Sequence, residues 1–198
     1  MKVSLLFVLA AQFAVSLSCD DQYVECLEYE VLAEHQEYEE RKYSATTWVS
    51  VTVEGSSLSK AESSVLYQLG RYIQGYNSKN LFINTTMPIR TKIESCRSEN
   101  CSTKYTISFL IPKGIENDPP APTDHALFLE KEPPRVYAVR RLNGTFTQTF
   151  WESSLEILQR SIENEIVLKQ DVSYIARFYY DTVFNYFKRF IEIWIELE

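Results

Sequence analysis

The sequence predicts an α+β fold in which a duplicated strand-strand-helix-strand-strand unit builds one antiparallel sheet with two helices. Three observations support this prediction. The chain resembles itself at a fixed offset, each half holds one segment with helical apolar spacing, and the flanking segments are rich in β-branched and aromatic residues. One such half has too few strands to cover its own helix. Two halves that share a sheet bury both helices and form one domain.

The offset is 89 residues, which takes position 48 onto position 137, and the match continues without a gap through both helical segments. A repeat of this length that occurs twice indicates a duplicated unit, since a solenoid needs three or more shorter repeats. The copies span about residues 36–112 and 125–198. The matched pairs are Trp48 with Tyr137, Gly55 with Gly144, Leu66 with Leu155, Leu69 with Leu158, Ile73 with Ile162, and Gly75 with Asn164.

Residues 1–18 predict a secretory signal peptide. A lysine precedes an apolar run that ends at about Val15, and the small residues Ser16 and Ser18 suit a cleavage site. The run is shorter than the roughly 20 residues that cross a bilayer, so a membrane span is not expected. Cleavage after this segment would leave a mature single domain of residues 19–198, which is expected to be secreted and extracellular.

The first copy is predicted to begin with a short strand, a turn and a longer strand, followed by a helix and a hairpin. The segment TTWVSVTVEG at 46–55 is β-branched. From Leu58 onward apolar residues recur with helical spacing, Ser57 or Ser59 can cap the helix, and Gly75 can end it. The segments NLFINTTMPIRTKI and KYTISFLIP, which the CRSENC loop joins, predict an antiparallel hairpin.

A proline-rich run from Asp118 to Pro122 lies between the copies. Proline lacks an amide hydrogen and has a fixed φ, so DPPAP is expected to be a stiff, extended connector. The second copy follows with a short strand, a turn, a longer strand and a helix over roughly 147–164. The segments DVSYIARFYYD and RFIEIWIEL predict a closing pair of strands.

The four cysteines predict two disulfides, because an even number is typical of an oxidising compartment. Of the three possible connectivities, the tight CRSENC loop favours Cys96 with Cys101, and hence Cys19 with Cys26. A zinc site is the alternative, but the paired C-x-x-C spacing is missing, so no metal is expected.

Three N-x-S/T sequons agree with a secretory route and predict a glycoprotein. Closure of Cys101 into a disulfide would stiffen the loop around Asn100. Asn143, just before a glycine, is the best candidate for glycosylation, and Asn84 is the third.

Charge and composition exclude several functions. The net charge of −7 argues against nucleic acid and anionic membranes as partners. Two histidines and five glycines leave no convincing catalytic triad and no phosphate-binding loop, so the protein is not expected to be an enzyme.

From about Tyr29 to its end, the chain resembles the SOUL haem-binding protein family. The matching segments are YEERKYSATTWVSVTVEG, RYIQGYN, TTMPI, IPKGIENDPPAPTDHALFLEKEPPRVYAVRRLNG and EIWIEL. The resemblance implies a pseudo-two-fold fold with a strongly twisted, barrel-like sheet. It also implies non-catalytic binding of haem or another tetrapyrrole.

The resemblance further implies a site on and beside the first helix. The apolar candidates are Leu66, Leu69, Tyr72 and Ile73, with Arg71 as the basic partner of a haem propionate and Lys188 or Arg189 as a second one. A guanidinium can bind such a carboxylate through two hydrogen bonds. The leucines and the isoleucine also lie on the stripe that must pack on the sheet, so a purely structural role is the alternative.

One departure concerns the iron. A histidine proposed as axial ligand in some family members is replaced here by Lys42, which can ligate only when deprotonated. His35 and His125 are interpreted as surface residues. Weak, largely hydrophobic haem binding, or ligation by an unidentified residue, is therefore expected.

A second departure leaves another class of function open. Near the C-terminus the Gly-Tyr turn with a proline that is usual in the family is missing, and an aromatic cluster takes its place. It could form an interface in a secreted protein-interaction or structural protein that has lost haem binding, or it could fill the core. The cluster comprises Tyr179, Tyr180, Phe184, Tyr186, Phe187 and Phe190.

Overall fold

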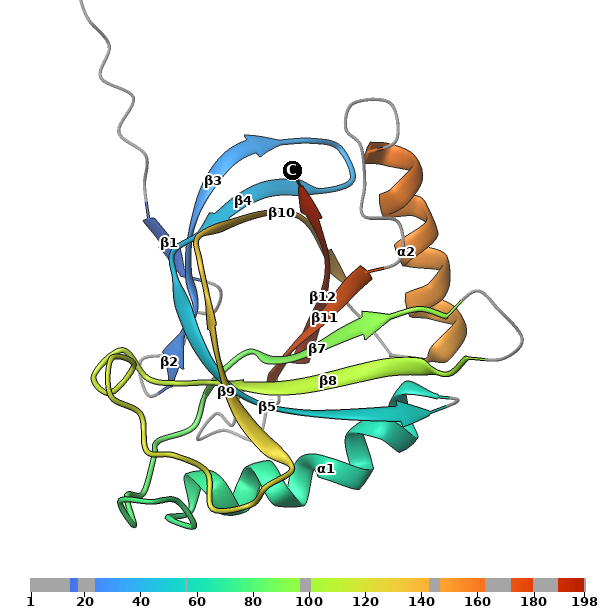
Figure 1. Ribbon diagram of the computed structural model, residues 1–198. Helices are drawn as coiled ribbons and strands as arrows, with labels where there is room; N and C mark the ends of the chain where they lie inside the picture. The colour runs from blue at the N-terminus through green and yellow to red at the C-terminus, as the bar shows by residue number, and fades with distance from the viewer. Residues whose placement is uncertain are drawn as a thin grey trace, which may run out of the picture.

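The computed structural model describes residues 24–55, 57–96, 101–142, 147–162, 172–179 and 189–197, and the backbone of Val15–Leu17. One antiparallel sheet curls into an open barrel, with both helices packed on its outside (Figure 1). The α+β class predicted from the sequence is confirmed.

The described residues form ten strands of one sheet in the order β1-β3-β4-β10-β12-β11-β7-β8-β5-β9. A parallel pair, β2 with β6, lies beside it. The strands are β1 (Val15–Leu17), β2 (Glu25–Cys26), β3 (Glu28–Glu34), β4 (Glu39–Tyr43), β5 (Thr46–Gly55), β6 (Thr86–Met87), β7 (Ile89–Glu94), β8 (Thr103–Leu110), β9 (Leu127–Glu132), β10 (Arg135–Leu142), β11 (Val172–Tyr179) and β12 (Arg189–Leu197). The helices are α1 (Leu58–Ile73) and α2 (Gln148–Ile162).

The duplication is visible in the strand order. Between β4 and β9 the sheet has a pseudo-two-fold centre where β7 and β11 meet, and there Thr91 pairs with Ile175. The two copies exchange their first strands, because β4 of the first copy pairs with β10 of the second and β9 of the second pairs with β5 of the first. Each copy therefore completes the sheet of the other.

The sequence located most elements closely, with two corrections. The first strand of the predicted hairpin begins only at Ile89, since the preceding chain is a loop apart from the two residues of β6. Ser57 occupies the N-cap position of α1, but its side chain makes no capping hydrogen bond. Gly75 has a φ of 99°, a left-handed conformation that glycine adopts without strain, and it lies just past the helix as predicted.

The sheet buries a different core on each face. Aliphatic residues of α1 and α2, among them Leu69 and its repeat partner Leu158, pack on the outer face. Aromatic residues fill the inner face, where Trp48 and its repeat partner Tyr137 lie in one cluster with Trp194. The repeat therefore preserves which side of the sheet each residue faces.

Two buried arginines lie among these aromatic rings. Arg90 donates hydrogen bonds of 2.7 and 2.8 Å to the two carboxylate oxygens of Glu132, and its guanidinium lies 4.0 Å from the ring centre of Trp48. Arg41 donates to the fully buried Glu192 at 3.0 Å. These pairs satisfy charges that would otherwise be costly to bury.

Neither helix in the described part of the chain is long and apolar enough to cross a membrane.

Candidate functional site

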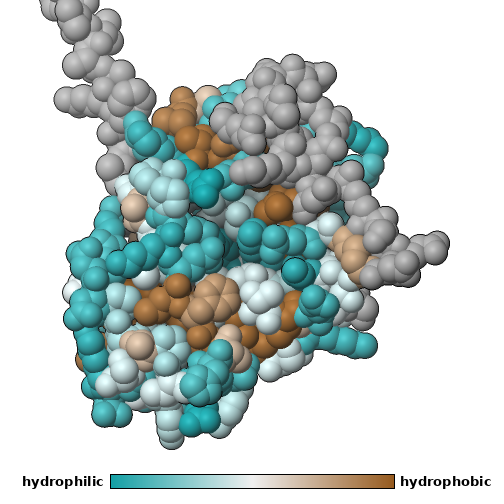
Figure 2. Space-filling view, viewed as in Figure 1, coloured by the Kyte–Doolittle hydropathy of each residue, from teal (hydrophilic) through white to brown (hydrophobic). Residues whose placement is uncertain are grey.

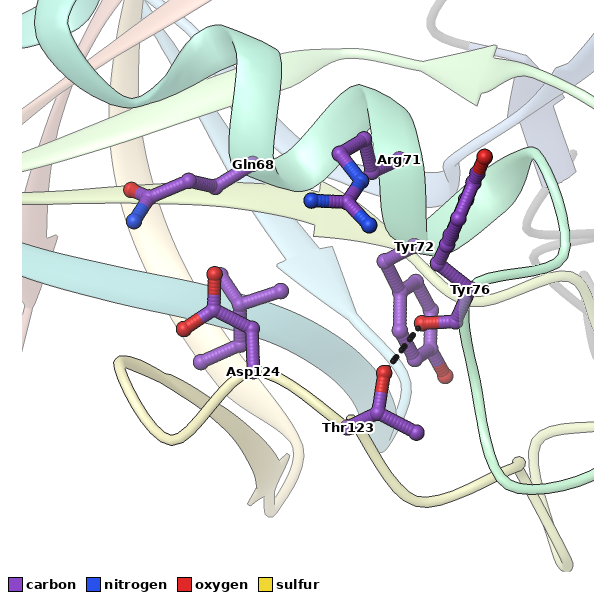
Figure 3. Close-up of a pocket in the computed structure, with 7 residues that line it drawn as sticks. Gln68, Arg71, Tyr72, Tyr76, Thr123 and Asp124 are labelled. Atoms are coloured by element: carbon purple, nitrogen blue, oxygen red, sulfur yellow. Dashed lines mark hydrogen bonds between the residues drawn. The ribbon is translucent and has the colours of Figure 1, made fainter.

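A cavity of about 210 Å³ lies between the C-terminal half of α1 and the proline-rich connector. In Figure 3, side chains from both segments line the cavity from opposite sides. Those from α1 and the residues just after it are Gln68, Arg71, Tyr72 and Tyr76, and those from the connector and the start of β9 are Thr123, Asp124 and Leu127.

Buried Asn77 shapes the loop that follows α1. Its side-chain amide donates to the carbonyl oxygen of Tyr72 at 2.9 Å and to that of Leu81 at 2.8 Å. Its side-chain oxygen accepts hydrogen bonds from the backbone amides of Lys79 and Leu81. With Gly75 reversing the chain before it, Asn77 sets the position of the neighbouring Tyr76.

The connector is fastened to this loop by hydrogen bonds. Ser78 donates its backbone amide to the Ala121 oxygen at 2.9 Å, and its hydroxyl accepts from the Ala121 amide at 2.8 Å. The Tyr72 hydroxyl donates to the Pro120 oxygen at 2.8 Å, and Thr123 donates to the Tyr76 oxygen at 3.0 Å. The stiff run predicted from the prolines therefore forms one wall of the cavity.

Arg71 is the positive charge of the cavity. It is exposed, and its guanidinium lies 4.1 Å from the ring centre of Tyr76. Among the described residues no carboxylate pairs with it, and the Asp124 carboxylate accepts instead from the Ala126 amide. Burial raises the pKa of Tyr72 to about 12, so its hydroxyl stays protonated as a donor. The cavity thus offers a guanidinium and an exposed aromatic ring to an anionic, flat ligand.

The predicted helix residues do not form one surface. Leu69 is fully buried in the core and Ile73 packs against it, so the structural alternative describes these two positions. Leu66 is 39% exposed, but it lies five residues from Arg71 and hence about 140° away around the helix axis. Of the predicted residues whose side chains the structure describes, Arg71 and Tyr72 alone line the cavity.

The proposed iron-ligand position is remote from the cavity. Lys42 is exposed on β4, whereas α1 packs on β5 and β8 near the other end of the sheet. His35 lies before β4, 2.9 Å from the Glu40 carboxylate, and His125 is exposed in the connector, in line with the interpretation of both as surface residues.

The second basic partner lies in a part of the chain that is not fully described. Lys188 is outside the described residues, and Arg189 is described only as the first backbone position of β12.

The aromatic cluster near the C-terminus is described only in part. Phe190 stacks on the fully buried Phe178 with ring centres 4.4 Å apart, which supports the core interpretation for this member. Tyr179 is described by its backbone alone, and the remaining members, Tyr180, Phe184, Tyr186 and Phe187, lie outside the described residues.

Of the covalent predictions, the Cys96–Cys101 disulfide is confirmed. Cys26 is disulfide-bonded as well, but Cys19 lies outside the described residues, so their pairing stays a prediction. Asn84 is exposed, while Asn100 and Asn143 also lie outside the described residues.

The sequence drew attention to RYIQGYN and DPPAPTDH, but it assigned no ligand role to Tyr76, Thr123 or Asp124. Tyr76 is far from Thr123 and Asp124 along the chain, and hydrogen bonds between the loop and the connector help to bring them together.

The fold and the cavity define a class: duplicated α+β domains with a recess beside the first helix. The model of the SOUL heme-binding protein family matches residues 24–196, so the chain belongs to this family. Heme-binding protein 2 of Mus musculus is 31% identical over 159 residues, which cover 80% of this chain and 77% of that protein. Heme-binding protein 1 of Xenopus laevis is 26% identical, with coverage of 79% and 82%.

Solved structures extend the likeness to the fold alone. The crystal structure of the EcmrR C-terminal domain superposes with a TM-score of 0.58 at 11% identity, over 81% of this chain and 98% of that domain.

Proposed function

We propose that the protein binds haem or another tetrapyrrole without catalysis, with one carboxylate edge of the macrocycle at Arg71. The observation that carries this proposal is the cavity on α1, where the guanidinium has no carboxylate partner among the described residues. Two heme-binding proteins among the relatives support the ligand class. A fork-shaped guanidinium is suited to a propionate.

The size of the cavity limits the mode of binding. At about 210 Å³ it is smaller than the 300–1,000 Å³ that enclose a drug-sized ligand. One edge of the macrocycle would enter, and the rest would lie against the surface of α1, where Tyr67 is one turn from Arg71 and 74% exposed. Figure 2 shows apolar surface gathered on the face where α1 meets the sheet. Such binding is expected to be open and of modest affinity.

The side chains at the cavity are better suited to bind the carboxylates of the macrocycle than to ligate its metal. Lys42 and His35 lie elsewhere. Of the two tyrosines that line this cavity, Tyr72 donates its hydroxyl to the Pro120 oxygen, and Figure 3 shows the hydroxyl of Tyr76 directed away from Thr123 and Asp124. Tyrosine is a known ligand of haem iron. The iron would add its Lewis acidity, but binding would not depend on it.

Hemin titration of the mature protein tests the proposal. The Soret band should shift and saturate near one equivalent, and iron-free protoporphyrin should bind with similar affinity. A featureless change that never saturates would refute tetrapyrrole binding.

We also propose that the protein is secreted and extracellular. The leader at 1–18, the Cys96–Cys101 disulfide and the sequons support this route. Expression of the full chain in secreting cells should give a protein in the medium whose N-terminus is Cys19. Retention of the uncleaved chain inside the cells would contradict the proposal.

A further inference from the structure

A second, larger recess lies beyond the Asn77 loop and is distinct from the cavity on α1. This groove of about 470 Å³ is lined mainly by apolar side chains, which include Leu81, Phe82, Pro112 and Ile115. Phe82 is 69% exposed, a large fraction for a phenylalanine. Among the described residues no lysine or arginine lines the groove, so the described lining offers no cationic partner to a propionate and does not fit the proposed haem site.

The groove also contains the sequon Asn84-Thr85-Thr86, through Asn84 and Thr85. Phe82 and Asn84 are both exposed, and the residue between them, Ile83, is buried. Both also line this one groove. The ring of Phe82 and the amide of Asn84 therefore lie close together at the surface of the groove.

The backbone holds Phe82 in place. It forms a bridge with Gln74, and the next amide, of Ile83, donates to the Ile73 oxygen at 2.8 Å. The loop is thus tied to the end of α1, and the exposed ring needs little ordering to receive a partner.

We propose that Asn84 carries an N-linked glycan whose first N-acetylglucosamine packs its apolar C–H face on Phe82, with the glycan stem covering the groove. The proposal rests on the secretory route proposed above and is independent of haem binding. The glycan would be attached to a residue of the groove itself. The apolar C–H face of its first sugar can pack on the aromatic ring of Phe82 in the way that other apolar surface does. It would cover an exposed apolar patch that has no described function.

The attachment is an ordinary glycosyl transfer. A lipid-diphosphate oligosaccharide is the donor; the bond from its anomeric carbon to the diphosphate oxygen breaks, and a bond from that carbon to Asn84 Nδ2 forms. The amide loses one proton, and the lipid diphosphate leaves with the electron pair.

The position of Thr86 indicates when this transfer takes place. Its hydroxyl donates to the Leu110 oxygen at 2.6 Å and is buried in the fold. A transferase that reads the sequon hydroxyl can reach it only before the chain folds. Glycosylation at Asn84 is therefore expected during translocation and not on the folded protein.

The first test is occupancy. The full chain is produced in secreting cells in two forms, one with its own leader and one behind an unrelated leader. The mass of the peptide that contains Asn84 is then measured by mass spectrometry before and after treatment with peptide N-glycosidase. Asn84 should be glycosylated, and Asn84→Gln should remove one glycan from the secreted protein. A bare Asn84 in protein secreted behind the unrelated leader overturns the proposal, whereas failure of the chain's own leader alone would count only against the secretory route.

The second test is a double-mutant cycle on the thermal midpoint. Phe82→Ala should lower the midpoint of the glycosylated protein and leave that of Asn84→Gln almost unchanged, because only the glycan gives the ring a partner. Tyr67→Ala, which removes another exposed ring, should shift both backgrounds equally. Equal shifts from Phe82→Ala in both backgrounds would overturn the packing on Phe82. Hemin affinity, measured on Asn84→Gln, should not change.

Discussion

Replacement of Arg71 by alanine should weaken hemin binding by about 5- to 30-fold. A hydrogen bond to a charged group contributes about 1.5–3 kcal/mol, and an exposed ion pair about 0.2–1 kcal/mol. Arg71 is exposed at the mouth of an open cavity, so an intermediate loss of about 1–2 kcal/mol is expected, at 1.4 kcal/mol for each tenfold change. The hemin affinity of Arg71→Lys should lie between that of the unmodified protein and that of Arg71→Ala, because an ammonium keeps the positive charge but lacks the two-pronged geometry of the guanidinium.

The repeat supplies a matched control for this experiment. Arg160 occupies the equivalent place on α2, and it pairs with Glu156 one turn away. Arg160→Ala removes the same charge from an equivalent helix, so it should leave the dissociation constant within about twofold. Equal effects of the two substitutions would show that the site is not at Arg71 and that only net charge matters. A loss on Leu66→Ser but not on Arg71→Ala would instead place the ligand on the opposite flank of α1.

Three further outcomes are expected. Tyr76→Phe should keep most of the hemin affinity and Tyr76→Leu should lower it if the ring supplies a stacking surface, as measured by the same titration. Glu132→Ala should lower the free energy of unfolding in urea by about 3 kcal/mol, because it leaves the buried Arg90 unpaired. Burial raises the pKa of the Glu62 carboxyl above 4.5, against the effect of Arg177, so the native protein should lose stability relative to Glu62→Gln as the pH rises from about 4.5 through this raised pKa.

A different result would contradict each of these three expectations. If Tyr76→Phe lost both a phenolate-to-iron charge-transfer band and hemin affinity, the phenol oxygen of Tyr76, and not its ring, would be the group that binds hemin. Lys131→Ala changes an exposed neighbour on β9, so a cost equal to that of Glu132→Ala would point to strand pairing rather than to the ion pair. A stability difference for Glu62→Gln that is constant between pH 4 and pH 7 would mean that the carboxyl titrates normally in the fold.

Some of the site could be read from the sequence, and some could not. The helix that carries Arg71 and Tyr72, and its end, were clear from local spacing and Gly75, and both residues line the cavity, while their role in binding stays a prediction. For Leu69 the sequence left a binding role and a core role open, since a helical stripe shows which residues share a face but not what covers that face; the structure buries Leu69 in the core. Tyr76 and Asp124 were missed because their proximity depends on hydrogen bonds between segments far apart in the chain.

The sequence by itself determined the duplication, the two helices, most strands and the stiffness of the connector. These features depend on the order of neighbouring side chains and on the geometry of proline, which are local properties. Only the tertiary structure decided that the two copies exchange β4 and β9, that arginines are buried among inner-face aromatic rings, and that the connector closes a cavity on α1. A strand pattern shows which face of a strand is buried but not which distant strand pairs with it, because that choice depends on the packing of the whole sheet.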